Sequence, residues 1–130
     1  MSFFLLDTHT FIWLSENDQN LPKRLRDMID VADSVYLSIA SLWEIAIKLN
    51  LGKLSLQRSY QTIESELQSS DISLLPIAFI DTLQICNLPL HHRDPFDRML
   101  IAQAMNRSLV LISRDNKFDA YPIQRLWTSA

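Results

Sequence analysis

Four acidic residues stand at positions from which their side chains could share one site. Asp7 ends a short apolar run, and Asp115 closely follows another such run. Asp97 lies in the first turn of a predicted helix, and Glu44 lies on the only polar stripe of another. Carboxylates that converge without matching cations repel one another, so they need a divalent metal to be stable together. Because oxygen ligands alone select Mg²⁺ or Mn²⁺ over zinc, the pattern predicts metal-dependent chemistry.

Strands and helices alternate along the chain and would position these acids. Short apolar or β-branched runs predict strands over residues 3–6, 35–37, 72–75, 109–112 and 123–127. Longer stretches with apolar stripes predict helices over residues 8–15, 22–32, 39–50, 59–69, 78–86 and 95–106. Gly52 is expected as a left-handed C-cap after the third helix. The order predicts one α/β domain over residues 1–130. In such domains the binding and catalytic residues lie beyond the carboxyl ends of the parallel strands.

Composition excludes several functional classes. The chain has 130 residues, of which 48% are hydrophobic and 21% charged, as is usual for a globular domain. The single glycine, Gly52, excludes a P-loop and a dinucleotide-binding fingerprint, since each needs several glycines. The lone Cys86 cannot form an internal disulfide or a multi-thiolate zinc site. No segment has the pattern of a transmembrane helix or a signal peptide, so we expect a cytoplasmic protein without a membrane partner.

Three of the acids have an ordinary structural interpretation beside the functional one. Asp7 can cap the helix that follows it, and Asp115 can belong to an ordinary turn; for each of them the two interpretations are evenly balanced. Glu44 has the spacing of a capping box with Ser41 and of an ion pair with Lys48. The apolar helical pattern begins before Ser41, however, which favours a functional role for Glu44.

The segment that begins at Asp94 has the chemistry of a helix start. Asp94 suits the N-cap and Pro95 the first helical position. This explains Asp94 fully, and we leave it out of the site. It explains Asp97 less well, because Asp97 continues into the apolar, inward face of the helix. Asp119 is expected at the surface or in a turn, and a supporting role beside the site is its alternative.

Histidines and tryptophans are expected to have structural roles. His91 and His92 are adjacent, so both rarely point into one site, and we expect them in a solvated loop. His9 is expected to pack or to support the site from outside rather than to bind a metal. Core positions are expected for Trp13, Trp43 and Trp127.

Five segments carry the most specific motifs: LDTHTFIW (6–13), SIASLWEIAIK (38–48), LGKL (51–54), HRDPFDRMLIAQA (92–104) and ISRD (112–115). In this order and spacing they resemble the PIN-domain nucleases, especially the VapC-type toxins of bacterial toxin–antitoxin pairs. The resemblance spans essentially the whole chain. It implies a three-layer α/β/α sandwich with a central, mainly parallel sheet of four or five strands. It also implies an acidic pocket that binds Mg²⁺ or Mn²⁺ and cuts RNA.

The resemblance also assigns individual residues and partners. The family's four acids, which bind metal and catalyse hydrolysis, fall on Asp7, Glu44, Asp97 and Asp115. Thr8 and Ser113 match the small hydroxyl positions beside those acids. The implied reaction is hydrolysis of RNA phosphodiester bonds that leaves 5′-phosphate and 3′-hydroxyl ends. The implied partners are a cognate antitoxin and a second copy of the chain in a homodimer.

Charge restricts how such a protein would contact RNA. The net charge of −3 argues against a broadly basic surface, so phosphate contacts must be local. Five basic residues near the acids are the candidates, although each also suits a solvated surface: Lys48, Arg93, Arg98, Arg114 and Lys117.

Other functional classes fit less well. A receiver domain needs an acidic pair after its first strand, where only Asp7 stands before Thr8. A two-aspartate phosphatase needs an acid at the position of His9. The main alternative to a nuclease is a non-catalytic α/β binding module that acts through a protein partner.

Overall fold

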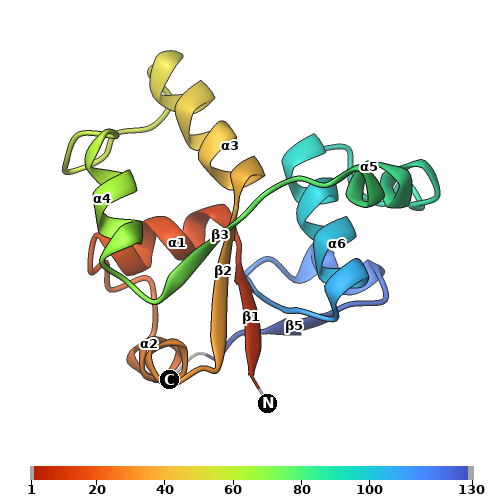
Figure 1. Cartoon of the computed structure of the whole chain (residues 1–130), viewed down its shortest axis with the longest axis horizontal. Helices are drawn as coiled ribbons and strands as arrows, with labels where there is room; N and C mark the ends of the chain where they lie inside the picture. The colour runs from red at the N-terminus through yellow and green to blue at the C-terminus, as the bar shows by residue number, and fades with distance from the viewer. Residues whose placement is uncertain (1, 129–130) are drawn as a thin grey trace.

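The computed structural model describes residues 2–128, in which strands and helices alternate (Figure 1). The elements are β1 (Phe3–Leu6), α1 (Thr8–Ser15), α2 (Lys23–Asp30), β2 (Ser34–Ser38), α3 (Ile39–Asn50), α4 (Thr62–Gln68), β3 (Ile72–Leu75), α5 (Phe79–Cys86), α6 (Pro95–Arg107), β4 (Val110–Ile112), the 3₁₀ helix η1 (Asn116–Ala120) and β5 (Gln124–Leu126). Every predicted strand and helix is present. The sequence did not predict η1, and α4 begins later than expected. None of the helices described is long and apolar enough to cross a membrane.

The sheet has five strands in the order β3-β2-β1-β4-β5, and every neighbouring pair is parallel. This confirms the predicted parallel sheet. The chain moves from β1 through β2 to β3 on one side and returns to place β4 and β5 on the other. The strand order therefore reverses between β1 and β4. Such a switch point opens a crevice beyond the carboxyl ends of these two strands.

The two faces of the sheet bury two separate apolar clusters. Side chains alternate along a strand, so Phe4 and Leu6 face one cluster while Leu5 between them faces the other. The first cluster includes residues of α1, α2, α3 and α4, and the second is formed largely by α6 and the segments beside it. Figure 1 shows these helices on opposite sides of the sheet. The three-layer α/β/α arrangement is thus confirmed.

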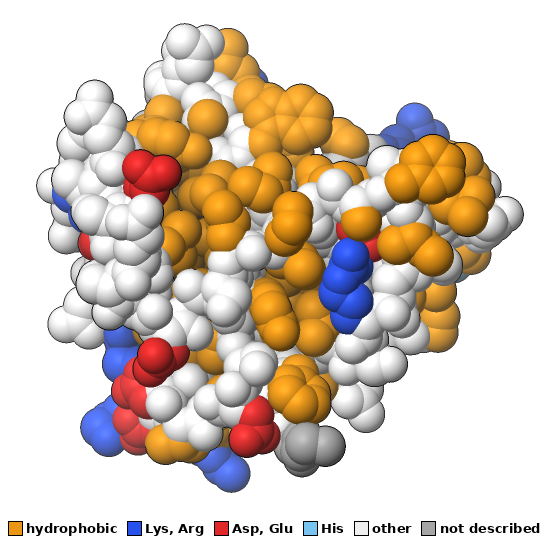
Figure 2. All heavy atoms as spheres, in the orientation of Figure 1, with side chains coloured by type: hydrophobic (Ala, Val, Ile, Leu, Met, Phe, Trp, Pro, Cys, Tyr) orange, Lys and Arg blue, Asp and Glu red, His pale blue; other side chains and the backbone are white. Residues whose placement is uncertain are grey.

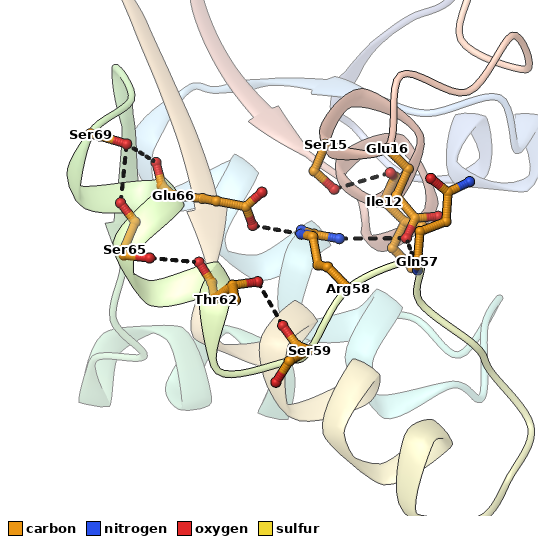
Figure 3. Close-up of polar contacts among 10 residues, drawn as sticks. All are labelled: Ile12, Ser15, Glu16, Gln57, Arg58, Ser59, Thr62, Ser65, Glu66 and Ser69. Atoms are coloured by element: carbon orange, nitrogen blue, oxygen red, sulfur yellow. Dashed lines mark hydrogen bonds and ion pairs between the residues drawn. The ribbon is translucent and has the colours of Figure 1, made fainter.

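Arg58 fixes the long connection between α3 and α4 (Figure 3). Its Nε atom donates to Glu66 Oε2 on α4 at 2.6 Å, and its Nη1 atom lies 3.5 Å from Glu16 Oε2 at the end of α1. The same Glu16 oxygen accepts a hydrogen bond from the backbone nitrogen of Gln57 at 2.7 Å. One guanidinium therefore ties the connection and α4 to α1.

Asp81 joins α5 to α6, the helix that carries Asp97. The Asp81 side chain is fully buried and accepts hydrogen bonds from both terminal nitrogens of Arg107, at 2.6 and 3.1 Å. Asn106 Nδ2 and the backbone nitrogen of Ala78 donate to it at 3.0 and 2.9 Å. Burial raises the pKa of Asp81, but these hydrogen bonds outweigh it and lower the pKa from 3.8 to about 2. The carboxylate is therefore ionised and paired at neutral pH.

Removing this carboxylate should destabilise the fold. Asp81→Ala leaves Arg107 without its buried partner, so we expect the free energy of unfolding in urea to fall by about 3 kcal/mol at pH 7. Because the pKa of Asp81 is lowered, the wild-type advantage should exist above about pH 4 and disappear as the pH falls through about 2. Asp119→Ala, which breaks an exposed pair with Arg125, should cost much less. Equal losses in the two variants would contradict this role.

Candidate metal centre

The carboxyl ends of β1 and β4 bring Asp7 next to the segment that carries Asp115. The Asp7 backbone nitrogen donates to Ile112 O, the last carbonyl of β4, at 3.1 Å. Asp7 is buried and caps α1, with Oδ1 accepting from the Thr10 backbone nitrogen at 2.8 Å. The Asp115 backbone nitrogen donates to Ser113 Oγ at 3.0 Å, and Asp115 Oδ1 caps η1 by accepting from the Lys117 backbone nitrogen at 3.0 Å. Both acids are therefore caps and also line the crevice of the sheet.

Glu44 comes to the same crevice from α3. The N-cap of α3 is Ser38, so the capping box with Ser41 is not formed. Glu44 is buried; its Oε1 atom accepts from Thr8 Oγ1 at 2.6 Å and its Oε2 atom from Lys48 Nζ at 2.6 Å. The ion pair with Lys48 is thus present, and Thr8, next to Asp7, holds the carboxylate against α1.

Asp97 comes from the first turn of α6. Asp94 is the N-cap, and its Oδ1 accepts from the backbone nitrogens of Phe96 and Asp97 at 2.8 and 3.0 Å. Asp94 thus has the capping role that the sequence indicates. The half-buried Asp97 has a carboxylate oxygen that lies within 4.8 Å of ligand atoms of both Asp115 and His92. This group of three is able to hold a metal ion.

Electrostatics show that the acids share one environment. Burial and the charges of Asp94, Glu44, Asp7 and Asp115, in that order of effect, together raise the pKa of Asp97 from 3.8 to about 7. The ion pair of Glu44 with Lys48 offsets part of this charge, and the pKa of Asp97 is still raised. Several carboxylate oxygens that repel one another in a half-buried crevice fit a divalent cation, which would neutralise them.

A hollow of about 260 Å³ adjoins Asp7 and Asp115, and its other walls are His9, Trp13 and Arg114. The guanidinium carbon of Arg114 lies 4.6 Å from the centre of the Trp13 ring, and the His9 ring centre lies 5.8 Å from it. Trp13 is therefore a half-buried wall of this hollow rather than a wholly interior residue. A cation and two aromatic rings stand beside the acids.

The other basic candidates differ in their surroundings. Arg93 and Lys117 are exposed, and Lys48 forms an ion pair with Glu44. Arg98 makes contacts within the protein. Its guanidinium donates to the backbone carbonyls of Leu88, Pro89 and His92 at 3.1 to 3.3 Å, and it therefore supports the loop before α6.

Two aromatic residues contradict the sequence-based expectation. Trp43 is 57% exposed, with its ring edge packed on Phe96, rather than being a core residue. His92 is buried, although we expected a solvated loop. Its ring stacks on Phe118 of η1 at 5.2 Å, and η1 had no signal in the sequence. Sequence reasoning therefore missed His92 as a residue of the site.

A larger hollow of about 600 Å³ lies away from the acids, between α3, α4 and β3. Its apolar lining includes Leu42, Ile63, Leu67, Ile72 and Leu74. Figure 2 shows hydrophobic side chains gathered over this region of the surface. The size and apolar lining suit an apolar ligand or partner, whereas the smaller hollow carries the acids and the cation.

The pKa of Asp97 predicts how the stability of the metal-free protein depends on pH. A carboxyl whose pKa is raised to about 7 stabilises the fold at low pH, and this stability is lost as the pH rises through about 7. Since asparagine imitates the protonated carboxyl, Asp97→Asn should remove that loss. Urea unfolding in EDTA at pH 5 and pH 8 should therefore show the wild type losing about 2–4 kcal/mol relative to Asp97→Asn. If the free energy of unfolding changed with pH in the same way in both proteins, the shared environment of the acids would be contradicted. The control is Asp71→Asn, at the opposite end of the sheet, which should follow the wild type.

Comparisons with known proteins agree with this architecture. No curated protein sequence matches the chain significantly. Among solved structures, the VapBC2 complex of Rickettsia felis bound to a promoter DNA fragment is 13% identical, with a TM-score of 0.72 over 95% of this chain and 96% of that one. DNA-bound VapBC of Salmonella typhimurium is 19% identical, with a TM-score of 0.69 over 97% and 98% of the two chains. A toxin–antitoxin complex of Klebsiella pneumoniae is 18% identical, with a TM-score of 0.62 over 95% of each chain. At these identities the similarity shows the fold.

The family model that matches the sequence settles the classification. It describes the PIN domain and matches residues 4–124, which contain all four acids of the crevice. The chain therefore belongs to the PIN domain family.

Proposed function

We propose that this PIN domain is a metal-dependent endoribonuclease and the toxin of a toxin–antitoxin pair. The observation that carries the proposal is the convergence of Asp7, Glu44, Asp97 and Asp115, expressed in the raised pKa of Asp97. PIN domains are typically nucleases, and solved structures of the same fold include VapBC and toxin–antitoxin complexes.

Mg²⁺ or Mn²⁺ is the proposed cofactor, with Asp7, Asp97 and Asp115 as ligands and Glu44 bound directly or through water. Such an ion, when bound, makes water acidic enough to be a nucleophile near neutral pH and neutralises charge that develops on the phosphate. In-line attack by water on phosphorus would break the bond to the 3′ oxygen, leaving a 5′-phosphate and a 3′-hydroxyl. The Thr8 hydroxyl and the Lys48 ammonium would fix the orientation of the Glu44 carboxylate, and Ser113 would hold the backbone of Asp115.

The hollow beside the acids supports RNA as the substrate. The exposed Arg114 stands next to Asp7 and Asp115 and would contact a backbone phosphate. His9 and Trp13 place aromatic rings in the same hollow, where an unpaired base could stack. Arg93 and Lys117 are the remaining candidates for phosphate contacts, since Arg98 and Lys48 are engaged within the protein.

The proposed partners are an antitoxin protein and a second copy of the chain, in the cytoplasm. The likeness to toxin–antitoxin complexes supports the first partner, and the apolar hollow between α3 and α4 offers a surface of suitable chemistry. Light scattering of the purified chain tests the homodimer: a mass of twice 15.1 kDa supports it, and a mass of 15.1 kDa contradicts it.

Cleavage of a mixed RNA substrate tests the proposed activity. We expect wild type to cut with Mg²⁺ or Mn²⁺ and not with EDTA. Asp7→Asn and Asp97→Asn should each lose about 100-fold or more in rate, because each removes a carboxylate that would hold the metal ion against the reacting phosphate. Asp71→Asn should retain wild-type activity, since Asp71 is exposed at the opposite end of the strands.

Circular dichroism of every variant is the control for folding. If folded wild type cuts none of many RNAs, the nuclease assignment is contradicted and the binding module replaces it. Equal cleavage by wild type and by both site variants would show that these acids are not catalytic.

A further inference from the structure

His92 has a buried side chain without polar partners. Only 9% of the residue is exposed, and neither ring nitrogen has a hydrogen-bond partner in the described residues. The ring stacks on Phe118 at 5.2 Å with an interplanar angle of 18° and meets the Tyr121 ring at 5.5 Å. Burying an imidazole nitrogen without a partner costs free energy, so such a group calls for a ligand.

The side chain faces the acidic crevice. One ring nitrogen lies within 4.8 Å of carboxylate oxygens of Asp97 and Asp115, too far for a hydrogen bond. Two ligands of one ion are separated by about 3–4 Å, because metal–ligand bonds are about 2 Å long. The three groups are therefore near enough to converge on one ion, and they do not form a direct ion pair.

The backbone around His92 is held in place on both sides. The backbone nitrogens of His91 and His92 both donate to the Tyr121 hydroxyl, at 3.0 and 2.7 Å. Arg98 Nη1 donates to the His92 carbonyl at 3.2 Å. With its ring packed against two aromatic rings as well, His92 is pre-organised, as a metal ligand needs to be.

We propose that His92 gives a nitrogen ligand to the divalent ion bound by Asp97 and Asp115, an inference that rests on the proposed metal site. The centre is then a mixed nitrogen and oxygen site, and not the oxygen-only site that the sequence suggested. An imidazole ligand favours transition metals over Mg²⁺, so His92 biases the site toward Mn²⁺. His91 and His9 are both exposed, and neither belongs to the group formed by His92, Asp97 and Asp115.

The test is electron spin-echo spectroscopy of Mn²⁺ bound to the full chain, with and without ¹⁵N-labelled histidine. The chain has three histidines, so the double variant His9→Gln/His91→Gln leaves His92 as the only source of an imidazole signal. We expect this variant to show imidazole nitrogen coupling to Mn²⁺ that changes with the label. His92→Gln should lose the coupling, and its preference for Mn²⁺ over Mg²⁺ in calorimetry should fall about 10-fold.

The outcomes separate this inference from the proposed function. Mn²⁺ binding that depends on Asp97 but shows no imidazole coupling in the double variant overturns the role of His92 and leaves the acidic site intact. Coupling that persists in His92→Gln overturns it equally. Absence of Mn²⁺ binding, or binding unchanged by Asp97→Asn, contradicts the proposed metal site itself. The double variant leaves His92 in place, so the result does not depend on whether His92→Gln folds.

Discussion

Repulsion among the carboxylates at the carboxyl edge of the sheet is the constraint that the rest of this structure accommodates. A parallel sheet whose order reverses at β1 places the ends of β1 and β4 together, and helices α3 and α6 add acids from either side. At Asp97 burial and four neighbouring charges act in the same direction, so its pKa rises to about 7. The fold thus holds charge in an arrangement that a divalent cation would relieve.

Helix capping is how the chain tolerates that charge without a bound ion. Asp7 caps α1, Asp94 caps α6 and Asp115 caps η1, so each accepts hydrogen bonds from a helix N-terminus. The positive end of a helix dipole stabilises an acid in the first turn, which includes Asp97. The structural and functional interpretations of Asp7 and Asp115 are therefore compatible, since one carboxylate oxygen caps the helix while the other stays available.

Local patterns in the sequence predicted most of the fold. Apolar runs, a proline after an N-cap and the glycine after α3 are signals that need no distant partner, and the elements that they predict are present.

The surroundings of individual side chains depend on distant contacts, which the sequence does not reveal. His92 is buried because the Tyr121 hydroxyl, far along the chain, binds its backbone. Trp43 is exposed although α3 is apolar on nearly every side, and Arg98 binds carbonyls of a loop whose path the sequence does not reveal. The site acids were selected by resemblance as much as by pattern; their proximity follows from the sheet order.

The most direct test of the central claim is the pKa of Asp97 itself, measured by carboxyl ¹³C NMR with and without Mg²⁺ and assigned with Asp97→Asn. We expect a pKa of about 7 in the metal-free protein and a marked fall when Mg²⁺ is added, because the cation neutralises the charges that raise it. An ordinary pKa that Mg²⁺ leaves unchanged would show that the acids do not form a common metal centre.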